Sequence, residues 1–311
     1  MKPTVSIIMA TYNRAHLIVE VLESIMKQSF RDWECLIIDD GGTDNTKEVI
    51  NFILEKDNRF DFFQRTNKYK KGLPGCRNYG LDLAKGERII FFDDDDIVHP
   101  DNLKKGLEVL EYYNVDFCHY QKLVYEGQKT IFESKPITVK QYLTLNDLEN
   151  VVTQKIGLAS CTVLWKKKCF KKVRFNENLL YAEEWECYSR LISEKFNGII
   201  INNVLYYNRK HANSNTGAFN KKNPVLRASY VNALLLIVIN LKEKKLLTNN
   251  LKRYFISISI DYKEFNLFKA LLNTLGLSKF EKFRWQFFYT TFPFRLKLYQ
   301  IKLIINKRSN S

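Results

Sequence analysis

The segment Val5-Ser6-Ile7-Ile8-Met9-Ala10-Thr11-Tyr12-Asn13-Arg14 joins a short apolar run to residues with polar side chains. An apolar run of this length, rich in β-branched residues, is typical of a buried strand. Helical periodicity follows it, with one face formed by Leu17, Val21, Leu22 and Ile25. We therefore expect a strand, a polar loop and a helix in this order.

The same alternation continues as far as residue 92. Strand patterns occur at 35–38, 60–64 and 88–92, and helical patterns at 46–54 and 80–84. Strands that alternate with helices at this spacing form βαβ units and a mostly parallel sheet. The fold class is therefore α/β, and ligands are expected beyond the carboxyl ends of the strands.

Polar residues follow three of these expected strands directly. They are Thr11-Tyr12-Asn13, then Asp39-Asp40-Gly41-Gly42, and finally Asp93-Asp94-Asp95-Asp96. All three sets fall where a parallel sheet forms its binding crevice. This coincidence predicts one site built from three loops.

The four adjacent carboxylates of Asp93 to Asp96 are the strongest chemical signal in the sequence. These carboxylates repel one another, and the packing of a hydrophobic core gives no reason for their presence. Mg²⁺ and Mn²⁺ prefer oxygen ligands and typically take one or two carboxylates together with phosphate oxygens. We expect a divalent cation here, and a solvated acidic loop is the alternative.

The segment from Asp39 to Thr46 has the residues of a turn before a helix. Gly41 and Gly42 permit positive φ, and Thr43 or Asp44 can cap the helix. Two aspartates at the strand end exceed what a turn needs. A carboxylate there can accept hydrogen bonds from a base or a ribose.

The ordered set Val5–Arg14, Asp39–Asp44, Arg77–Gly80 and Phe92–Asp96 resembles family 2 glycosyltransferases with the GT-A fold. Order, spacing and strand-end placement agree over roughly residues 3 to 210, although Gly42 stands where the family often has Ser. The resemblance implies an inverting, metal-dependent transfer of a sugar from a nucleotide diphosphate, expected to be UDP, to an acceptor hydroxyl. The setting that it implies is cell-surface polysaccharide or lipid-linked glycan synthesis.

The resemblance also implies roles for single residues. Asp93 and Asp95 match the D-x-D pair that binds Mn²⁺ or Mg²⁺, with Asp95 as the direct ligand. Asp40 and Arg77 match residues at the uracil, and Asp94 matches the residue that reaches the ribose. Plain alternatives are a core tyrosine for Tyr12 and a surface ion pair for Arg77. The full nucleotide and sugar pocket that the resemblance implies is Ala10, Thr11, Tyr12, Asn13, Arg14, Asp40, Arg77, Asp94 and His211.

The segment Tyr181-Ala182-Glu183-Glu184-Trp185 carries the expected catalytic base. The family usually has Glu-Asp-Trp here, with the aspartate as base, and this chain has Glu184 in its place. Sugar transfer needs a carboxylate that takes the proton of the acceptor hydroxyl. We expect Glu184 to be that base and Glu183 to be its substitute. An acid-rich helix N-terminus, which the helix dipole favours, is the alternative.

His211 lies in a polar loop with Arg209 and Lys210. It resembles a family loop that brings a histidine close to the diphosphate and the metal, so His211 is a candidate for both nucleotide and metal binding. Such a loop is also the usual material of a lid. An exposed histidine without a role is the alternative.

The net charge of +15 is concentrated near the C-terminus, because 15 Lys and Arg but only 4 Asp and Glu lie from Lys242 onward. A polar stretch, 208–224, separates the two parts. We expect a GT-A catalytic domain at 1–222 and a helical, basic and aromatic region at 223–311. Basic residues beside aromatic ones suit an anionic membrane surface. A helical appendage packed on the catalytic domain is the alternative.

The six cysteines are scattered without a CxxC pair, which fits buried thiols in a reducing compartment. The start of the chain shows no secretory signal pattern. The apolar run Ala233–Ile239 is far shorter than the ~20 residues that cross a bilayer. We expect a cytoplasmic enzyme that rests peripherally on the cytoplasmic face of the membrane.

Three rival functions remain open. A nucleotidyltransferase should have a glycine-rich phosphate loop after the first strand, where this chain has Thr11 to Arg14. A nucleic-acid-binding protein could use the positive charge, but the acidic cluster would repel phosphate, so no specific nucleic acid is expected. The third rival is a catalytically inactive sugar-nucleotide-binding protein.

Overall fold

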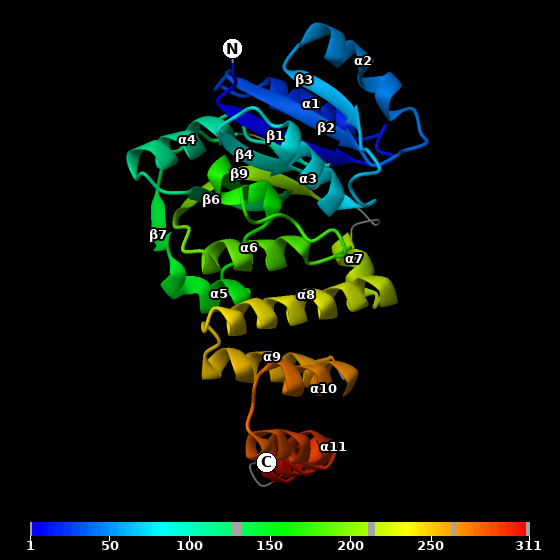
Figure 1. The fold of residues 1–311 in the computed structure, drawn as a ribbon, viewed down its shortest axis with the longest axis vertical. Coiled ribbons are helices and arrows are strands. Elements are labelled where there is room, and N and C mark those ends of the chain that lie inside the picture. Colours follow the sequence, from blue (N-terminus) through cyan, green and yellow to red (C-terminus); the bar gives the residue numbers. More distant parts are fainter. Residues whose placement is uncertain (1, 126–131, 211–214, 263–264, 309–311) are drawn as a thin grey trace. The chain divides into compact units, whose positions relative to one another are not determined.

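The computed structural model describes residues 2–125, 132–210, 215–262 and 265–308 (Figure 1). A sheet of nine strands in these residues has the order β3-β2-β1-β4-β8-β6-β9-β5, with β7 paired to β9. The strands are β1 (Val5–Thr11), β2 (Trp33–Asp39), β3 (Phe60–Gln64), β4 (Arg88–Phe92), β5 (Ile97–Val98), β6 (Phe117–Tyr125), β7 (Val139–Leu143), β8 (Val163–Lys166) and β9 (Gly198–Arg209).

The helices include the crossover connections of this sheet. They are α1 (Ile18–Met26), α2 (Thr46–Lys56), α3 (Leu73–Leu83), α4 (Asn102–Tyr112), α5 (Leu148–Val152), α6 (Glu183–Ser193), α7 (Asn215–Asn220), α8 (Pro224–Glu243), α9 (Asn249–Asp261), α10 (Phe265–Thr274) and α11 (Lys279–Arg308). Short 3₁₀ turns lie at Leu145–Asp147, Ser160–Thr162 and Lys167–Phe170.

The expected parallel half of the sheet is confirmed. β1 pairs in parallel with β2 and with β4, and β2 pairs in parallel with β3. The residues of β2 are buried along its whole length, as a strand covered on both faces requires. Packing of α3 on β1 is close, because a Cβ at Gly80 would lie 2.4 Å from Cγ2 of Ile8. The glycine therefore sets the helix-to-sheet distance in this layer.

The remaining strands make the sheet mixed. β8 is antiparallel to both β4 and β6, whereas β6 and β9 are parallel with irregular register. Local patterns after Pro100 predicted only mixed strands and helices, because antiparallel pairing with a distant strand leaves no periodic signal of its own. The result agrees with the expected α/β class.

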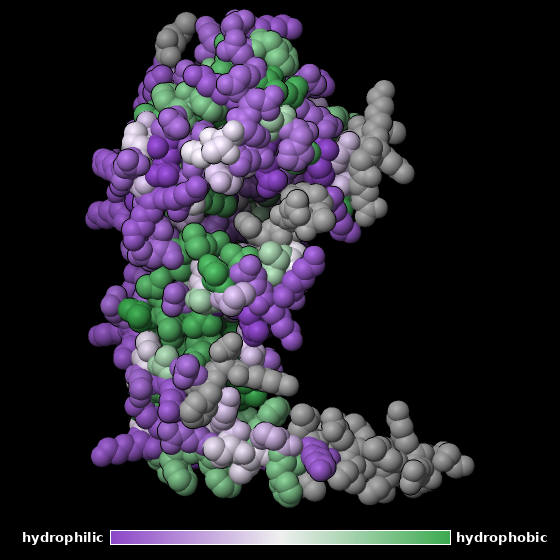
Figure 2. All heavy atoms as spheres, turned by 90° about the vertical axis from the view of Figure 1, so that its right-hand side faces the viewer, coloured by the Kyte–Doolittle hydropathy of each residue, from purple (hydrophilic) through white to green (hydrophobic). Residues whose placement is uncertain are grey.

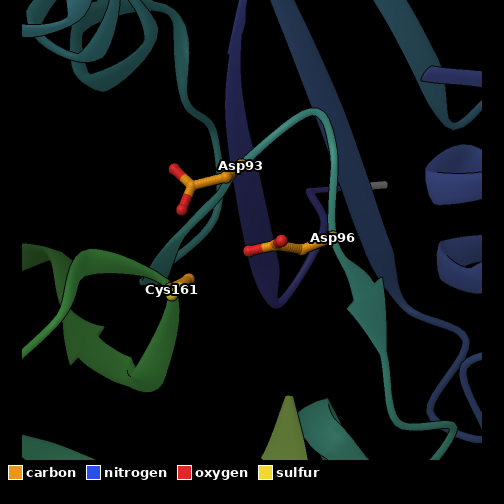
Figure 3. A group of neighbouring side chains, drawn as sticks. All are labelled: Asp93, Asp96 and Cys161. Carbon is orange, nitrogen blue, oxygen red and sulfur yellow. The ribbon is translucent and has the colours of Figure 1, made fainter. Parts of the chain in front are cut away.

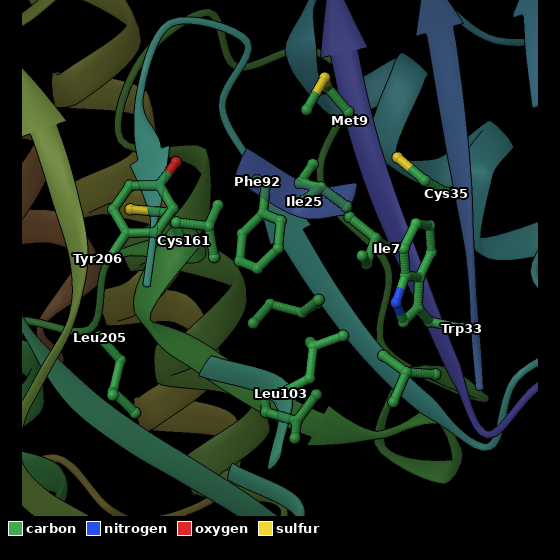
Figure 4. Close-up of a cluster of buried hydrophobic side chains, with 14 of the residues drawn as sticks. Ile7, Met9, Ile25, Trp33, Cys35, Phe92, Leu103, Cys161, Leu205 and Tyr206 are labelled. Carbon is green, nitrogen blue, oxygen red and sulfur yellow. The ribbon is translucent and has the colours of Figure 1, made fainter. Parts of the chain in front are cut away.

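A hydrophobic core joins the two halves (Figure 4). Ile7 and Met9 of β1, Trp33 of β2, Phe92 of β4 and Tyr206 of β9 all contribute to it and are almost completely buried. Since these residues come from strands on both sides of β4, one core packs β1, β2 and β4 together with β9. The candidate site is built at the carboxyl ends of β1, β2 and β4.

The chain divides into two compact units, residues 1–237 and 238–311, so α8 begins in the first unit and ends in the second. α8 has 20 residues and a mean hydropathy of 1.6 in its most apolar window, of which 39% is buried. It is longer than the apolar run Ala233–Ile239 considered above, and by length and composition it could cross a membrane. Core helices of soluble proteins have the same length and composition.

Candidate active site

Loops after three parallel strands meet at one edge of the sheet. Thr11 lies directly beside Asp39 in the register of β1 and β2, and the backbone N–H of Asp40 donates to the carbonyl of Thr11 at 2.9 Å. Met9 pairs with Phe92, so the acidic run begins beside the same ends. The expected convergence of the three polar loops is therefore observed.

Within the acidic run, two carboxylates face a common space. Ligand atoms of Asp93, Asp96 and Cys161 lie within 4.8 Å of one another (Figure 3). Asp96 is completely buried and accepts hydrogen bonds from the Asn208 side chain and from the Arg209 backbone N–H at 2.8 Å. Asp96 is thus fastened to β9, and it was not among the site residues expected from the sequence.

The negative charge of the acidic run is only partly compensated by the positively charged groups around it. Burial, together with the smaller effect of neighbouring carboxylates, raises the pKa of Asp94 to about 7 and that of Asp96 to about 7. Burial also raises the pKa of Asp93 to about 6, against the opposing charge of Arg77. The Asp93 side chain is 35% exposed, so water screens part of this effect. A bound cation would relieve the repulsion among the three groups.

The donor set fits a hard divalent cation. Asp93 and Asp95 approach guanidinium groups at 3.6 Å, which is ion-pair contact rather than hydrogen bonding. Burial raises the pKa of the Cys161 thiol far above its ordinary value, so the sulfur stays protonated and offers a poor ligand. The ligands that this site offers to a cation are therefore carboxylate oxygens, and Mg²⁺ and Mn²⁺ prefer oxygen ligands.

Arg77 connects the acidic run to the expected base. Its side chain is 3% exposed, and Nη1 lies 2.9 Å from Oε1 of Glu183 and 3.9 Å from Oε2 of Glu184. Nη2 donates to the Ser160 hydroxyl at 2.8 Å and lies 3.6 Å from Asp93. In the described residues its charged partners are these carboxylates. Its role at the uracil, implied by the resemblance, stays a prediction.

The two glutamates at the start of α6 have different environments. Glu183 is buried against Arg77, and burial raises its pKa above the ordinary value. The Glu184 side chain is 32% exposed, and its Oε2 accepts the backbone N–H of Ser160 at 3.0 Å. One carboxylate is therefore held in an ion pair, and the other is anchored yet open to solvent.

The loop before α6 is held in an unusual backbone conformation. Ala182 has a φ of 62°, in the left-handed region that L-residues rarely adopt. Ser229 of α8 bonds the two preceding residues, since its hydroxyl accepts the N–H groups of Leu180 and Tyr181, each at 2.9 Å. Contacts with α7 and α8 therefore set the position from which both glutamates project.

Aromatic stacking supports the same loop from two sides. The rings of Tyr181 and Phe219 stack with centroids 4.5 Å apart, and those of Trp185 and Tyr230 stack at 5.3 Å. The indole N–H of Trp185 donates to the carbonyl of Val152 at 3.1 Å. These supports were not expected from the sequence, because only the folded chain brings residues 219–230 to the start of α6.

The loop after β1 presents the other expected pocket residues. Ala10 is half-buried and Thr11 is buried, whereas Tyr12 is 45% exposed with the ammonium of Lys71 over its ring, 4.6 Å from the centroid. Asn13, at a φ of 54°, accepts the N–H of Thr43 at 2.7 Å. The loops after β1 and β2 are thereby tied together.

Arg14 faces the acidic run from this loop. Its guanidinium lies 3.4 Å from Asp94 and 3.6 Å from Asp95. The side chain is 26% exposed, so it keeps access to the open side of the site. The position suits a group that contacts both carboxylates and an anionic ligand.

Asp40 is held by two donors. Its carboxylate accepts from Nε of Arg65 at 2.6 Å and from the backbone N–H of Gly72 at 2.9 Å. Arg65 directly follows β3, and its place after an expected strand was the signal that could have singled it out. A base that bonds Asp40 would have to share the carboxylate with Arg65.

His211 lies outside the described residues. The preceding Arg209 is described, and its guanidinium donates to the carbonyl of Asp95 at 2.9 Å and pairs with Glu20 at 2.5 Å. The start of the loop that carries His211 is thus attached to the acidic run. The two roles expected for His211 stay predictions.

Comparison with known proteins adds a match to a family model. The model described as Glycosyl transferase family 2 matches residues 6–168, which contain β1 except for Val5, the strands β2 to β8 and the whole acidic run. The matched segment covers more than half of the chain. It ends before α6, so both glutamates lie beyond it.

Two curated relatives and one solved structure show the range of similarity. An uncharacterized glycosyltransferase of Rickettsia felis is 32% identical over 58% of this chain, but the match spans only 29% of that protein. UDP-Glc:alpha-D-GlcNAc-diphosphoundecaprenol beta-1,3-glucosyltransferase WfgD of Escherichia coli is 32% identical over 51% of this chain and 59% of its own length. S. aureus TarS in complex with UDP-GlcNAc has a TM-score of 0.67 at 20% identity, covering 88% of this chain and 80% of that one, which shows a shared fold.

Proposed function

The chain belongs to glycosyl transferase family 2, and we propose that it transfers a sugar from a UDP-sugar to an acceptor hydroxyl. The reaction is a single in-line displacement that inverts the anomeric centre. The donor class follows the name of the E. coli relative, which uses UDP-Glc. Which sugar this chain transfers depends on the pocket around residues beyond Pro100.

The observation that carries the proposal is the position of Arg77 between two groups of carboxylates. It lies 3.6 Å from Asp93 on one side and 3.9 Å from Glu184 on the other. A metal-bound diphosphate at Asp93 and an acceptor at Glu184 would therefore be neighbours. Holding two reactants side by side in this way is a main source of rate enhancement.

Glu184 acts as the general base in this proposal. Its partial exposure lets an acceptor hydroxyl reach it, and the Ser160 N–H fixes one of its oxygens. A general base must lie within hydrogen-bond reach of the proton that it takes. Glu183 forms an ion pair with Arg77 and holds the guanidinium of Arg77 in place.

Asp93 and Asp95 hold the divalent cation, Mn²⁺ or Mg²⁺, in this proposal. When bound, the cation stabilises the charge of the departing nucleoside diphosphate. Arg14, beside Asp94 and Asp95, contacts the phosphates, and the exposed ring of Tyr12 offers a stacking face to the base. Asp94 reaches the ribose, Asp40 bonds the edge of the base, and His211 binds the diphosphate and the metal.

The acceptor is proposed to be a lipid-linked glycan. The E. coli relative acts on a diphosphoundecaprenol-linked sugar, as its name states. Residues 1–222 form the catalytic domain, and the basic region 223–311 brings it to the cytoplasmic face of the membrane. The concentration of positive charge near the C-terminus supports this location.

A screen of UDP-sugars for metal-dependent UDP release tests the proposal. We expect release by the wild type with Mn²⁺ or Mg²⁺, and a loss of at least about 100-fold in Asp95→Asn and in Glu184→Gln. Asp61→Asn on β3 and the exposed Glu48→Gln on α2 are matched controls that should keep full activity. Activity that survives both EDTA and Asp95→Asn would contradict the metal site. UDP binding without release would indicate an inactive binding protein.

A further inference from the structure

A half-open cavity of about 520 Å³ lies within the C-terminal unit, between α9 and α11. α9 contributes Lys252 and Arg253 to its lining, and α11 contributes Arg284, Trp285 and Arg295. The cavity is separate from the site at the sheet edge, and the proposed transfer reaction does not use it.

The charge of this cavity is strongly positive. Lys252, Arg253, Arg284 and Arg295 line it with a single acid, Glu281. Glu281 has a local role, because its carboxylate accepts the backbone N–H of Ser278 at 2.8 Å near the start of α11. Its pKa is lowered by this bond and by the neighbouring cations. The cavity therefore suits a ligand with at least one negative charge.

An exposed aromatic stripe runs along α11, and two of its members, Phe283 and Phe287, also line the cavity. Phe280, Phe283, Phe287 and Phe294 are 69%, 64%, 61% and 67% exposed. Their separations of three, four and seven residues place them on one face of the helix. In the lower part of Figure 2, hydrophobic and hydrophilic side chains are interleaved on the surface of the C-terminal helices.

Cations and aromatic rings are also directly paired here. The guanidinium of Arg284 lies 5.9 Å from the centroid of Phe280, and that of Arg295 lies 4.9 Å from the centroid of Phe288. Phenylalanines beside cations fit the boundary between lipid headgroups and acyl chains, where one side is apolar and the other is anionic. In water, by contrast, four exposed phenylalanines on one helix face are unfavourable.

We propose that this cavity binds the phosphate of an anionic lipid headgroup while the phenylalanine stripe of α11 enters the membrane interface. The charge of the four cations selects anionic lipid, and the stripe supplies apolar burial. Only the biological role of this lipid binding, which is to bring the enzyme to a lipid-linked acceptor, rests on the proposed function. Binding to lipid is measured without any substrate.

The experiment measures binding of the full chain to vesicles of phosphatidylcholine, with and without 30 mol% phosphatidylglycerol (roughly a third anionic lipid). Trp285 is a built-in probe, because Trp33, Trp165 and Trp185 are buried. We expect binding and a blue shift of tryptophan emission only with the anionic vesicles. The shift should be absent in Trp285→Phe, which would identify Trp285 as its source.

Two double variants separate the contributions, and a third is their control. Arg284→Glu with Arg295→Glu changes the cavity, and Phe280→Ser with Phe294→Ser changes the part of the stripe that does not line the cavity; each should weaken binding at least about tenfold. Lys171→Glu with Lys172→Glu makes the same charge change at exposed positions of the first unit and should bind like the wild type.

Several outcomes would overturn the inference. They are equal binding to neutral vesicles, unchanged binding of the arginine variant, and full competition by inorganic phosphate, which would indicate a site for free phosphate. Tight binding to single-stranded DNA that the phenylalanine variant also loses would indicate a nucleic-acid surface instead. UDP release by the same wild-type preparation tests the proposed function separately, so failure of one does not imply failure of the other.

Discussion

Ser229 on α8 is bonded to Tyr181 through both backbone groups of that residue. The Ser229 hydroxyl donates to the Tyr181 carbonyl at 2.9 Å and accepts the Tyr181 N–H at 2.9 Å. Between Tyr181 and Glu184, the proposed base, lie only Ala182 and Glu183. The position of the proposed base therefore depends on a helix that lies outside the segment matched by the family model.

Replacing Ser229 by Ala should lower kcat roughly tenfold, because small displacements of a catalytic group are costly. Two N–H groups would lose their partner, which should also reduce stability by about 1–3 kcal/mol. Ser189→Ala on α6 is the control, since that hydroxyl is buried without a hydrogen-bond partner among the described residues. Kinetics and urea denaturation of both variants check this. Equal kcat in Ser229→Ala and the wild type would contradict the positioning role.

Ala182→Gly should stabilise the protein by up to about 1 kcal/mol. Glycine adopts positive φ without the steric cost that alanine carries. The resulting gain in stability should exceed the loss caused by the larger conformational entropy of glycine in the unfolded chain. The exposed Ala228 within α8 provides the opposite control, because glycine inside a helix costs about 1 kcal/mol. The urea midpoints of both variants measure the difference. A lower midpoint for Ala182→Gly would show that the loop is not strained.

Removing Arg77 should be severely destabilising. Arg77→Met leaves Glu183 buried without its partner, which should cost about 3–5 kcal/mol. Arg174→Met is the matched control, because the Arg174 and Asp82 side chains are each 40% exposed and such pairs contribute about 1 kcal/mol or less. Arg77→Lys tests the geometry: it keeps the charge but loses the planar fork, so we expect lower activity with a smaller loss of stability.

The metal-free protein should lose stability as the pH rises. The folded-state pKa values of Asp94 and Asp96 are raised to about 7, above the unfolded value of about 4. Their contribution is thus complete below about pH 4 and is lost as the pH passes through about 7. Thermal unfolding at pH 5 and pH 8 should show this, and Asp94→Asn should reduce the difference. A melting temperature that rises over this range would contradict it.

Mn²⁺ should stabilise the protein more at pH 8 than at pH 5.5, because protons compete with the metal for the same carboxylates. The stabilisation should be absent in Asp95→Asn and kept in Asp61→Asn. Thermal shift at fixed ionic strength with Mn²⁺, and with Ca²⁺ for comparison, measures the effect. An equal shift in Asp95→Asn and the wild type would place the metal elsewhere.

The sequence was sufficient for the features that arise locally. The run Val5–Ala10 and the buried strands after it predict the parallel half of the sheet, because strands covered on both faces are apolar throughout. Adjacency in sequence also places Asp93 to Asp96 at the end of a strand. The convergence of the three polar loops then follows from the geometry of parallel strands.

Only the tertiary structure decided which side chains meet at the site. Arg77 and Glu183 are 106 residues apart, Asp96 and Arg209 are 113 apart, and Leu180 and Ser229 are 49 apart. No periodicity connects such positions, because each contact depends on how separate elements pack. The same holds for Arg65 and Asp40, whose pairing requires β3 to lie beside β2. The sequence identified the types of residue at the site, whereas the packing of the folded chain determined which of these residues contact one another.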